Sequence, residues 1–338
     1  MIRENISLKA FNTFGVEVSA KYFAEISDEN QLKNVLKFAE ENQLTILFLG
    51  GGSNILFTKN FDGIVIHLNL KGISEEILDE NHILVNAKSG ENWHNFVMYC
   101  VNKNYGGIEN LSLIPGNVGT SPIQNIGAYG TEIKDVFRHC KVWNLQHEKI
   151  EILNLEQCKF GYRDSVFKRE GKGKYAVLEV GFKLTRKHHS IAMEYGAIKS
   201  ELEKLNIENP SIKDISNSVI AIRKSKLPDP KTLGNAGSFF KNPTVPLEQF
   251  EKLTLKFPEI PNYPNGDFVK IPAGWLIEQC GWKGKQIGNV ASHERQSLVV
   301  VNKTGNATGK EIFDFSEKII RSVKEKFGIM LEREVNVV

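Results

Sequence analysis

Glycine is concentrated in two segments of this 338-residue chain. GGGSN occupies residues 50–54, and residues 106–130 hold six of the 28 glycines, well above the chain average. Glycine lets the backbone approach a ligand closely and adopt positive φ, and runs of free N–H groups in such turns form concave anion sites. Either segment alone could be an ordinary turn, but together they predict a cradle for a pyrophosphate. The polar side chains that accompany these glycines are Ser53, Asn54, Ser121, Gln124 and Asn125.

The glycine spacing argues against two common nucleotide sites. GGGSNI lacks the third glycine of the dinucleotide fingerprint G-x-G-x-x-G, because position 55 is Ile. The chain contains no G-x-x-x-x-G-K-[ST], so a P-loop for ATP or GTP is unsupported. The remaining common ligand with a large pyrophosphate is a flavin bound by another fold, although these residues do not by themselves select FAD.

Arginine and serine side chains in two later motifs are further candidates for chemistry. Arg163, in GYRDS, carries a permanent charge and could hold a carboxylate in a fork, although a surface ion pair with Asp164 is the commoner arrangement for such a residue. Ser238, in GNAGSFFKNP, follows a glycine, and a serine in this position is normally a turn residue.

Two carboxylates near the end of the chain cannot be separated by their spacing. In LEREV, a strand period of two predicts Glu332 and Glu334 on one face, opposite Leu331, Arg333 and Val335. Either glutamate could point into a site, and both could equally lie on a solvated face.

The first half of the chain alternates strand-like and helix-like runs that would position these segments. Leu32, Val35, Leu36 and Ala39 have helical spacing, and Ser27 is the predicted N-cap of their helix. A second helix is predicted over 91–104, stopped by glycines. Strands are predicted at 21–26, 45–49, 63–68 and 82–87.

From about residue 136 the pattern changes to a mixed or antiparallel sheet. A helix is predicted over 211–225, and the Pro-marked linker at 226–231 predicts a domain boundary. Thr308 and Glu311 form a capping box that opens a helix ending at Gly328, and a terminal strand is predicted over 329–338. Strands are predicted at 136–145, 149–153 and 175–184.

Composition places the chain among ordinary globular proteins. With 41% hydrophobic and 25% charged residues it can bury a core, and its length predicts two or three domains. A net charge of +3 leaves no broad basic face, which argues against a nucleic-acid reader. Charges near the N-terminus and the lack of a long apolar run predict no signal peptide and no spanning helix, hence a cytoplasmic protein. The cysteines, with no C-x-x-C pair to suggest a zinc site or disulfide framework, are Cys100, Cys140, Cys158 and Cys280.

A series of motifs resembles the UDP-N-acetylenolpyruvoylglucosamine reductase (UDP-N-acetylmuramate dehydrogenase) family, in order and over nearly the whole chain. The most specific are PGNVGTSPIQNIGAYG, within residues 114–130, and GSFFKNP, within 234–243. The others are NTFG at 12–15, GGGSN at 50–54, FGYRDS at 160–165, LPDP at 227–230, AGWLIEQCG at 273–281 and LEREV at 331–335.

The resemblance implies an α+β fold. It consists of a vanillyl-alcohol-oxidase/PCMH-type FAD-binding fold followed by a MurB-type α+β substrate-binding domain. The implied divisions are 1–68 and 69–225 for two FAD-binding subdomains, 226–306 for the substrate-binding domain, and 307–338 for a helix and strand that return Glu334 to the active site.

The resemblance also implies a reaction of peptidoglycan precursor synthesis. NADPH, as co-substrate, would reduce a non-covalent FAD, and the flavin N5 would give a hydride to the vinyl carbon of UDP-N-acetylglucosamine enolpyruvate, forming UDP-N-acetylmuramate. Arg163 would stabilise the enolate that develops, and Ser238 would supply the proton. Glu334 would stand at the carboxylate end, where a protonated form with a raised pKa would donate a hydrogen bond.

Two sets of binding residues follow from the same match. Tyr195, in MEYGAI, corresponds to a tyrosine whose loop closes over substrate in the longer subclass of the family. The predicted substrate-binding residues are Tyr195, Lys226, Asn242, Tyr263, Lys283 and Gln296. The predicted cofactor-binding residues are Gly50, Gly51, Gly52, Ser53, Asn54, Pro115, Gly116, Gly119, Thr120, Ser121, Gln124, Asn125, Gly127, Ala128 and Tyr129.

Two other functions remain open from the sequence. A related FAD-dependent oxidase of the vanillyl-alcohol-oxidase type is one, although residues 114–130 lack the His or Cys that usually holds a covalent flavin. A non-catalytic nucleotide-binding module is the other, and the joint presence of Arg163, Ser238 and Glu334 argues against it. His293 is interpreted as a structural histidine. We expect a monomer that acts on a small-molecule substrate without nucleic acid, membrane or metal.

Overall fold

The computed structural model describes all 338 residues and divides them into two units, each assembled from separate stretches of the chain. Unit 1 comprises Met1–Ile6, Ala20–Gly51 and Asp62–Ser225. Unit 2 comprises Ser7–Ser19, Gly52–Phe61 and Lys226–Val338. The first half of the chain therefore contributes two short stretches to a unit that is otherwise formed by the last third.

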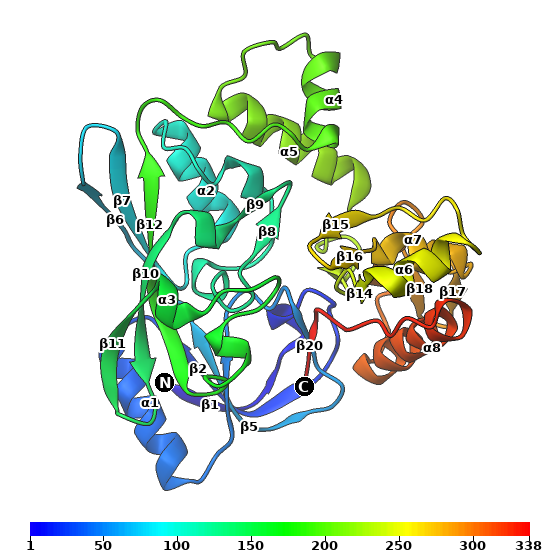
Figure 1. Cartoon of the computed structure of the whole chain (residues 1–338). Coiled ribbons are helices and arrows are strands. Elements are labelled where there is room, and N and C mark those ends of the chain that lie inside the picture. Colours follow the sequence, from blue (N-terminus) through cyan, green and yellow to red (C-terminus); the bar gives the residue numbers. More distant parts are fainter. The chain divides into compact units, whose positions relative to one another are not determined.

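The largest sheet of unit 1 is antiparallel throughout, with strand order β11-β10-β12-β7-β6 (Figure 1). The strands predicted at 82–87, 136–145, 149–153 and 175–184 are all present in it. Strand β6 was not predicted, because its residues Ser74–Glu76 are exposed and show no apolar pattern. The bounds are β6 (Ile73–Ile77), β7 (His82–Lys88), β10 (Phe137–Asn144), β11 (Lys149–Asn154) and β12 (Tyr175–Thr185).

A second sheet of unit 1, ordered β1-β2-β5-β3, is covered by helix α1 (Glu29–Glu41). The helix buries Leu32, Val35 and Ala39, as their spacing predicted. Its N-cap is Asp28, which accepts from two backbone N–H groups, so the assignment of Ser27 was wrong by one residue; the Ser27 hydroxyl bonds Gln31 instead. The strands are β1 (Ile2–Ser7), β2 (Ser19–Ile26), β3 (Ile46–Leu49) and β5 (Phe61–Leu68).

Three helices complete the packing of unit 1. Helix α2 (Trp93–Asn102) packs Trp93 and Phe96 against Phe182 of the large sheet. Helices α4 (Gly196–Lys204) and α5 (Ile212–Lys226) share a separate small apolar cluster. The shorter elements are α3 (Leu155–Cys158), β8 (Gly127–Ala128), β9 (Thr131–Glu132) and the 3-10 turns at Glu109–Leu111, Val118–Thr120, Ile133–Asp135 and Val166–Lys168.

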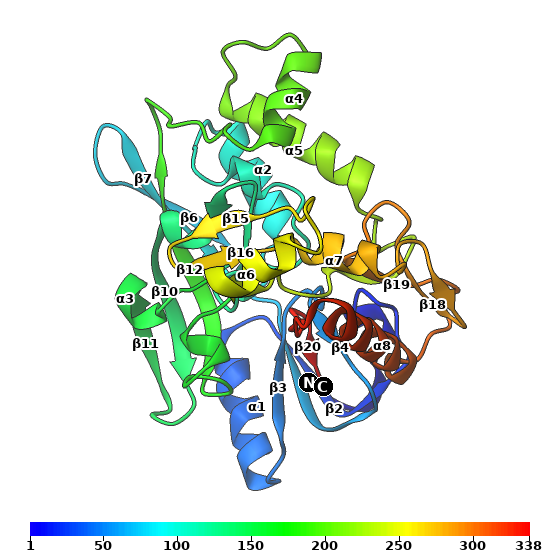
Figure 2. The ribbon, with the colours of Figure 1, turned by 45° about the vertical axis from the view of Figure 1, so that its right-hand side comes forward.

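Unit 2 contains two small antiparallel sheets with three helices, of which α6 lies beside β16 (Figure 2) and also packs against β14. The predicted capping box of Thr308 and Glu311 opens α8, and Gly328 ends it with φ 69°. The sheets are β13 (Asn235–Ser238), β19 (Val299–Asn302), β18 (Val290–Ser292) and β17 (Gln286–Ile287), and β14 (Thr244–Pro246), β16 (Phe268–Lys270) and β15 (Tyr263–Asn265). The helices are α6 (Leu247–Thr254), α7 (Ala273–Gln279) and α8 (Gly309–Phe327), with a 3-10 turn at Lys9–Phe11.

The terminal strand is much shorter than predicted. Only β20 (Asn336–Val337) forms a ladder, parallel to β4 (Ile55–Leu56), and one isolated bridge joins Arg333 to Phe240. Within 331–335, Leu331 and Val335 are buried and Glu332 is exposed, in line with the predicted alternation, and the Arg333 guanidinium donates to Ser316 Oγ of helix α8 at 2.8 Å.

All four cysteines are free thiols, three of them buried. No group of three His, Cys, Asp or Glu side chains is placed to hold a metal ion. Among the helices, none has both the length and the apolar composition that crossing a bilayer demands.

Candidate active site

The glycines of the two rich segments let their backbones touch within unit 1. A Cβ on Gly51 would lie 2.9 Å from the Cα of Gly116, and one on Gly50 would lie 2.5 Å from Thr120 Cγ2. A Cβ on Gly119 would lie 2.4 Å from Ser89 Cβ. Real side chains do not occupy such positions, so these three glycines are required by the packing of one loop on another.

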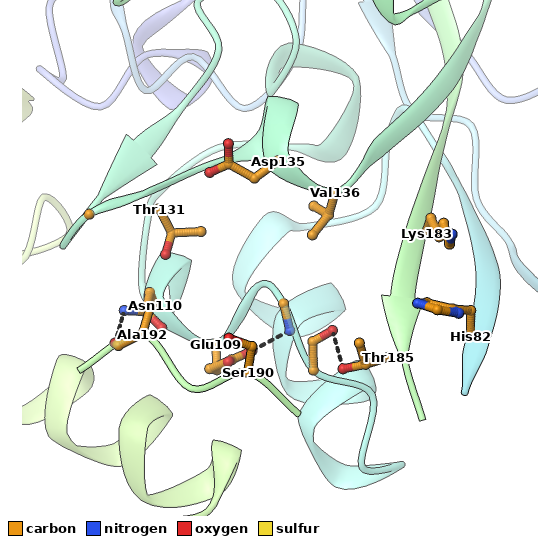
Figure 3. Close-up of a pocket in the computed structure, with 13 residues that line it drawn as sticks. His82, Glu109, Asn110, Thr131, Asp135, Val136, Lys183, Thr185, Ser190 and Ala192 are labelled. Atoms are coloured by element: carbon orange, nitrogen blue, oxygen red, sulfur yellow. Dashed lines mark hydrogen bonds between the residues drawn. The ribbon is translucent and has the colours of Figure 1, made fainter. Parts of the chain in front are cut away.

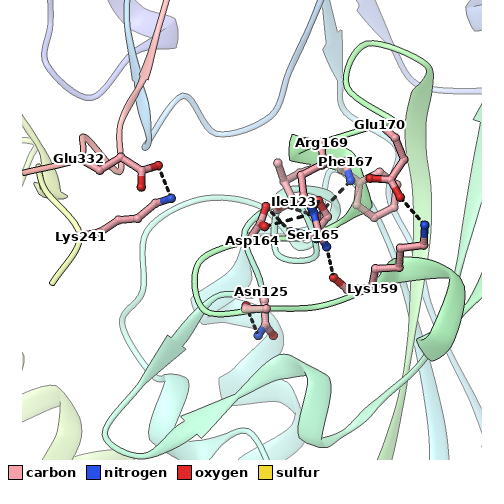
Figure 4. Close-up of polar contacts among 11 residues, drawn as sticks. Ile123, Asn125, Lys159, Asp164, Ser165, Phe167, Arg169, Glu170, Lys241 and Glu332 are labelled. Atoms are coloured by element: carbon pink, nitrogen blue, oxygen red, sulfur yellow. Dashed lines mark hydrogen bonds and ion pairs between the residues drawn. The ribbon is translucent and has the colours of Figure 1, made fainter. Parts of the chain in front are cut away.

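Two predicted cofactor side chains are instead hydrogen-bonded to other protein groups. Ser121 Oγ donates to the Val118 carbonyl at 2.7 Å. Asn125, fully buried, donates from Nδ2 to Glu132 and to the Gly161 carbonyl at 3.0 Å each, and accepts from the Lys134 N–H (Figure 4). Their side chains fix the shape of the loop, which leaves the main chain to meet a ligand.

Positive φ angles recur along this loop. Gly116 has φ 117°, Asn125 45°, Tyr129 51° and Gly130 83°. Alternation between right- and left-handed backbone turns N–H groups toward one side and forms anion-binding concavities. These angles occur in the loop where the glycine content predicted a pyrophosphate cradle, which stays a prediction.

Leu113, directly before this loop, is held from two sides. It has φ 59°, an uncommon conformation for a γ-branched residue. Its N–H donates to His94 Nδ1 at 3.0 Å, and its carbonyl accepts from Arg223 Nε at 3.2 Å. Burial lowers the pKa of His94, and the nearby charges of Lys224 and Arg223 lower it further, so the imidazole stays a neutral acceptor.

Arg223, on helix α5, is a half-buried cation without a carboxylate partner. Its guanidinium bonds the Tyr129 hydroxyl and the Leu113 carbonyl. Burial lowers its pKa, and the charge of Arg163 contributes to the same shift. A partly desolvated charge that neutral dipoles alone compensate favours an anionic ligand beside it. This is the second observation that fits a diphosphate-bearing cofactor at the loop.

The sequence analysis identified neither His94 nor Arg223. Neither residue belongs to a glycine-rich motif, and both act from helices on the backbone of another segment. The only available signal was the basic run IRKSK at the end of the helix predicted over 211–225.

Arg163 lies at the same loop. Its backbone has φ 53°, and its Nη2 donates to the Gly127 carbonyl at 2.6 Å. The Asp164 carboxylate, the alternative partner considered from the sequence, pairs with Arg169 Nε at 3.2 Å and accepts from the Ser165 N–H (Figure 4). Arg163 and Arg223 thus place two positive charges near the turn from Gly127 to Tyr129.

In unit 2, Ser238 and Glu334 are brought to neighbouring backbone segments. Ser238 ends β13, where it pairs with Val299, and Gly237 before it has φ 70°. The next residue, Phe239, accepts at its carbonyl from the Glu334 N–H at 2.9 Å. Residues nearly one hundred positions apart are therefore joined by one main-chain hydrogen bond beside the serine.

The structure distinguishes the two glutamates that the sequence left equivalent. Glu332 forms an ion pair with Lys241, and its side chain is 71% exposed (Figure 4). Glu334 is half-buried, and its carbonyl accepts from Asn54 Nδ2 at 3.2 Å. Glu332 thus has a surface role, whereas Glu334 shares the neighbourhood of Ser238 with a residue of the GGGSN motif.

The NTFG motif is hydrogen-bonded to β13, the strand that ends at Ser238, and to the neighbouring strand β19. The Thr13 carbonyl accepts from the Asn235 N–H at 3.0 Å, and the Phe14 carbonyl accepts from Asn302 Nδ2 at 2.9 Å. A Cβ on Gly234 would lie 2.3 Å from that same Phe14 oxygen. The glycine is needed because two backbones touch there, so NTFG and GNAG form one scaffold.

Two of the predicted substrate residues meet at the start of helix α7 in unit 2, and a third lies on the sheet β14-β16-β15. Asn242 Oδ1 accepts from the Ala273 N–H at 2.9 Å, at the start of α7. Gln296 reaches the same turn, since a Cβ on Gly274 would lie 3.2 Å from its Oε1. Tyr263 pairs with Lys270 across β15 and β16, with the Lys270 ammonium 6.0 Å from the Tyr263 ring centroid. Lys270 is a candidate that the sequence analysis did not identify.

The other predicted substrate residues lie elsewhere. Lys283, beyond the end of α7, is paired with Glu278 at 2.7 Å, and Lys226 is exposed at the end of α5. Tyr195 belongs to unit 1, where its ring meets that of Tyr129 edge-on at 5.3 Å between centroids. His293 is buried, and this burial lowers the pKa of its imidazole. Its backbone N–H donates to the Val299 carbonyl. We interpret it as a structural residue.

Two families of protein domain match successive parts of the chain. An FAD binding domain matches residues 20–151, and the C-terminal domain of UDP-N-acetylenolpyruvoylglucosamine reductase matches residues 229–338. A UDP-N-acetylenolpyruvoylglucosamine reductase of Flavobacterium johnsoniae is 50% identical over 100% of this chain and 99% of its own length. One from Pseudomonas putida is 43% identical over 99% and 98%.

A solved structure agrees in fold. The crystal structure of the corresponding reductase from Thermus caldophilus superposes with a TM-score of 0.68 at 22% identity, covering 100% of this chain and 99% of that one. The predicted α+β fold, with an FAD-binding part before a reductase-type C-terminal part, is confirmed.

Proposed function

Because the chain belongs to the UDP-N-acetylenolpyruvoylglucosamine reductase family, we propose that it reduces UDP-N-acetylglucosamine enolpyruvate to UDP-N-acetylmuramate with NADPH. The observation that carries the proposal is the hydrogen bond from the Glu334 N–H to the Phe239 carbonyl, because it brings the proposed proton donor and a carboxyl group together. This step would serve peptidoglycan precursor synthesis.

The cofactor would be FAD, held without a covalent bond. When bound, it would pass a hydride from NADPH to the terminal vinyl carbon of the substrate. In unit 1 the backbone from Gly116 to Thr120 and the turn from Gly127 to Tyr129 would hold its diphosphate and flavin, with Arg223 supplying the missing counter-charge. The buried side chains of Ser121 and Asn125 would keep the loop in shape.

Arg163 would stabilise the negative charge that develops on the carbon bearing the carboxylate. A guanidinium can donate two parallel hydrogen bonds to a carboxylate, and its position is already fixed by the bond to Gly127. A preorganised cation of this kind lowers the barrier because it does not have to reorient as charge forms.

Ser238 would deliver the proton to that carbon. A hydroxyl is a poor acid in water, but the enolate-like carbon is strongly basic, so the transfer is favourable once the two are in contact. Glu334 would interact with the carboxylate end of the substrate in its protonated form and donate a hydrogen bond.

The uridine diphosphate would be bound by Asn242 and Gln296, which meet at the start of α7, and by Tyr263 on β15. Lys226 and Lys283 would add charge, the latter at the expense of its ion pair with Glu278. Tyr195 would close over the bound substrate, as in the longer subclass of the family.

Several wider features belong to the same proposal. The protein would act as a cytoplasmic monomer. We retain the proposed divisions 1–68, 69–225, 226–306 and 307–338, although residues 7–19 and 52–61 pack with the last third of the chain.

The test is an NADPH oxidation assay of the purified yellow protein. We expect oxidation that depends on the enolpyruvyl sugar nucleotide, with UDP-N-acetylglucosamine as the inert control. In D₂O the product should carry deuterium at the carbon next to the carboxylate, because Ser238 exchanges with solvent. Oxidation that proceeds equally well without the sugar nucleotide, with consumption of oxygen, would instead identify an oxidase.

A further inference from the structure

Asn110 joins two segments of unit 1 that are far apart in sequence. It lies in the 3-10 turn Glu109–Leu111 and is 2% exposed. Its Nδ2 donates to the Ala192 carbonyl at 2.8 Å and to the Tyr129 carbonyl at 3.2 Å. Figure 3 shows the bond to Ala192 at the edge of a cavity. One side-chain amide thus uses both hydrogens on two main-chain acceptors.

The second of these acceptors belongs to a well-braced residue. Tyr129 has φ 51°, and its hydroxyl is bonded by the Arg223 guanidinium. The ring of Tyr195 stands edge-on to the Tyr129 ring, with centroids 5.3 Å apart and planes at 85°. Edge-to-face pairs are attractive beyond the area they bury. Asn110 and Tyr129 therefore hold the same short segment at two points.

That segment, residues 186–195, is attached at its start, where the Arg186 N–H donates to the Asn81 carbonyl at 2.7 Å and Lys187 pairs with Glu80 at 3.1 Å. It lies between β12 and α4 and belongs to no helix or strand. Ile191 packs on the apolar cluster of α4 and α5, and His189 bonds Thr185 near its start. Ser190 and Ala192 line a cavity of about 480 Å³ together with Glu109 and Asn110 (Figure 3). The bond from Asn110 holds the segment at Ala192, three residues before Tyr195.

We propose that Asn110 is a positioning residue for Tyr195, fastening the Tyr195 segment (residues 186–195) to the backbone of the proposed cofactor loop. The inference rests on the proposed function, in which Tyr195 closes over the sugar nucleotide. It predicts that loss of the anchor affects only the half-reaction that uses the sugar nucleotide. Reduction of the flavin by NADPH does not involve Tyr195 and should be unchanged.

The kinetic test is a double-mutant cycle of Asn110→Ala and Tyr195→Ala on the FAD-loaded enzyme. We expect Asn110→Ala to raise the KM for the sugar nucleotide roughly tenfold, the usual cost of a lost hydrogen bond. If Asn110 acts through Tyr195, the double variant should match Tyr195→Ala alone. Additive effects, an unchanged KM, or a parallel loss of flavin reduction by NADPH would overturn the proposal.

A second measurement does not depend on activity. Arg186 and Lys187 stand at the start of the segment, so limited trypsin cleavage there reports its attachment. We expect faster cleavage in Asn110→Ala than in the parent protein, and no change in Tyr195→Phe, which keeps the ring contact. Equal cleavage in all three would overturn the anchor even if turnover supports the proposed function. Conversely, faster cleavage in a protein inactive on the sugar nucleotide would keep the anchor and refute the function.

Discussion

Units 1 and 2 position their candidate site groups in opposite ways. In unit 1 the relevant region is the loop that holds Gly116 and Asn125, and in unit 2 it is the region around Ser238. In the first, polar side chains are consumed internally and the backbone is left to face a ligand. In the second, main-chain bonds tie Ser238 and Glu334 to neighbouring segments and leave their side chains for chemistry. Substitutions in the loop of unit 1 should therefore affect stability and cofactor binding, whereas substitutions in the Ser238 region should affect the rate of the reaction.

The largest effect should come from Ser238→Ala. The main-chain bonds around it do not use the hydroxyl, so the variant should bind FAD and accept a hydride from NADPH normally. Product formation should fall by about 10²–10⁴, or roughly 3–6 kcal/mol in the barrier, because general acid catalysis is lost. Stopped-flow measurement of flavin reduction and reoxidation separates the two steps. Unchanged turnover would remove Ser238 from the mechanism.

Arg163→Lys should be next, with turnover reduced by about 10²–10³, the usual cost of one preorganised charge-stabilising donor. A lysine keeps the charge but cannot reproduce the fork or the bond to Gly127. Arg169→Lys is the matched control, because Arg169 pairs with Asp164 on the surface of the same segment. Near-normal kcat in Arg163→Lys, or equal losses in both variants, would contradict the assignment.

The two glutamates give an internal comparison within unit 2. Glu334→Gln should lower kcat/KM by about 10- to 100-fold, the range for a lost hydrogen bond to a charged group. Glu332→Gln should be tolerated, because it removes only an exposed ion pair with Lys241. Steady-state kinetics of both variants suffice, and the reverse ranking would mean that the motif position was misassigned.

In the loop of unit 1, by contrast, Gly119→Ala should lower stability rather than chemistry. The added Cβ would press on Ser89, and overpacking of this kind costs about 1–3 kcal/mol. Thermal unfolding and the FAD content of the purified protein should both fall. Gly196→Ala, at the open start of α4, is the control and should cost nothing. If both variants retain FAD and the same Tm, the loop is less tightly packed than its distances indicate.

The smallest effect is a pH dependence of the same loop. Burial and the charges of Lys224 and Arg223 lower the pKa of His94, so the native state binds fewer protons than the unfolded state as pH falls through the usual value of 6.5. Stability should therefore decline as pH falls through that window and level off below the native pKa. In His94→Gln, which can still accept from Leu113, this decline in Tm should be smaller; an unchanged profile would assign it to other groups.

Local sequence signals predicted most of the elements and less of the site. The capping box of Thr308 and the stripe of Leu32, Val35 and Ala39 predicted their helices because those signals are local. Nothing local reveals that residues 7–19 and 52–61 join the last third of the chain. The choice between Glu332 and Glu334 depended on Lys241, ninety positions away, and Arg223 was missed because its role follows from a lack of counter-charge that only three dimensions show.

The discontinuous make-up of unit 2 has a consequence for how the protein is synthesised. Residues 7–19 and 52–61 leave the ribosome early, yet their partners follow only after the whole of Asp62–Ser225. The carbonyls of Thr13 and Phe14 therefore lack these hydrogen bonds until Asn235 and Asn302 have been synthesised. Such long-range pairing is slow and exposes unpaired strands meanwhile. The residues of unit 1 are all synthesised by Ser225, whereas the Ser238 region needs the last residues of the chain, because Glu334 pairs with Phe239.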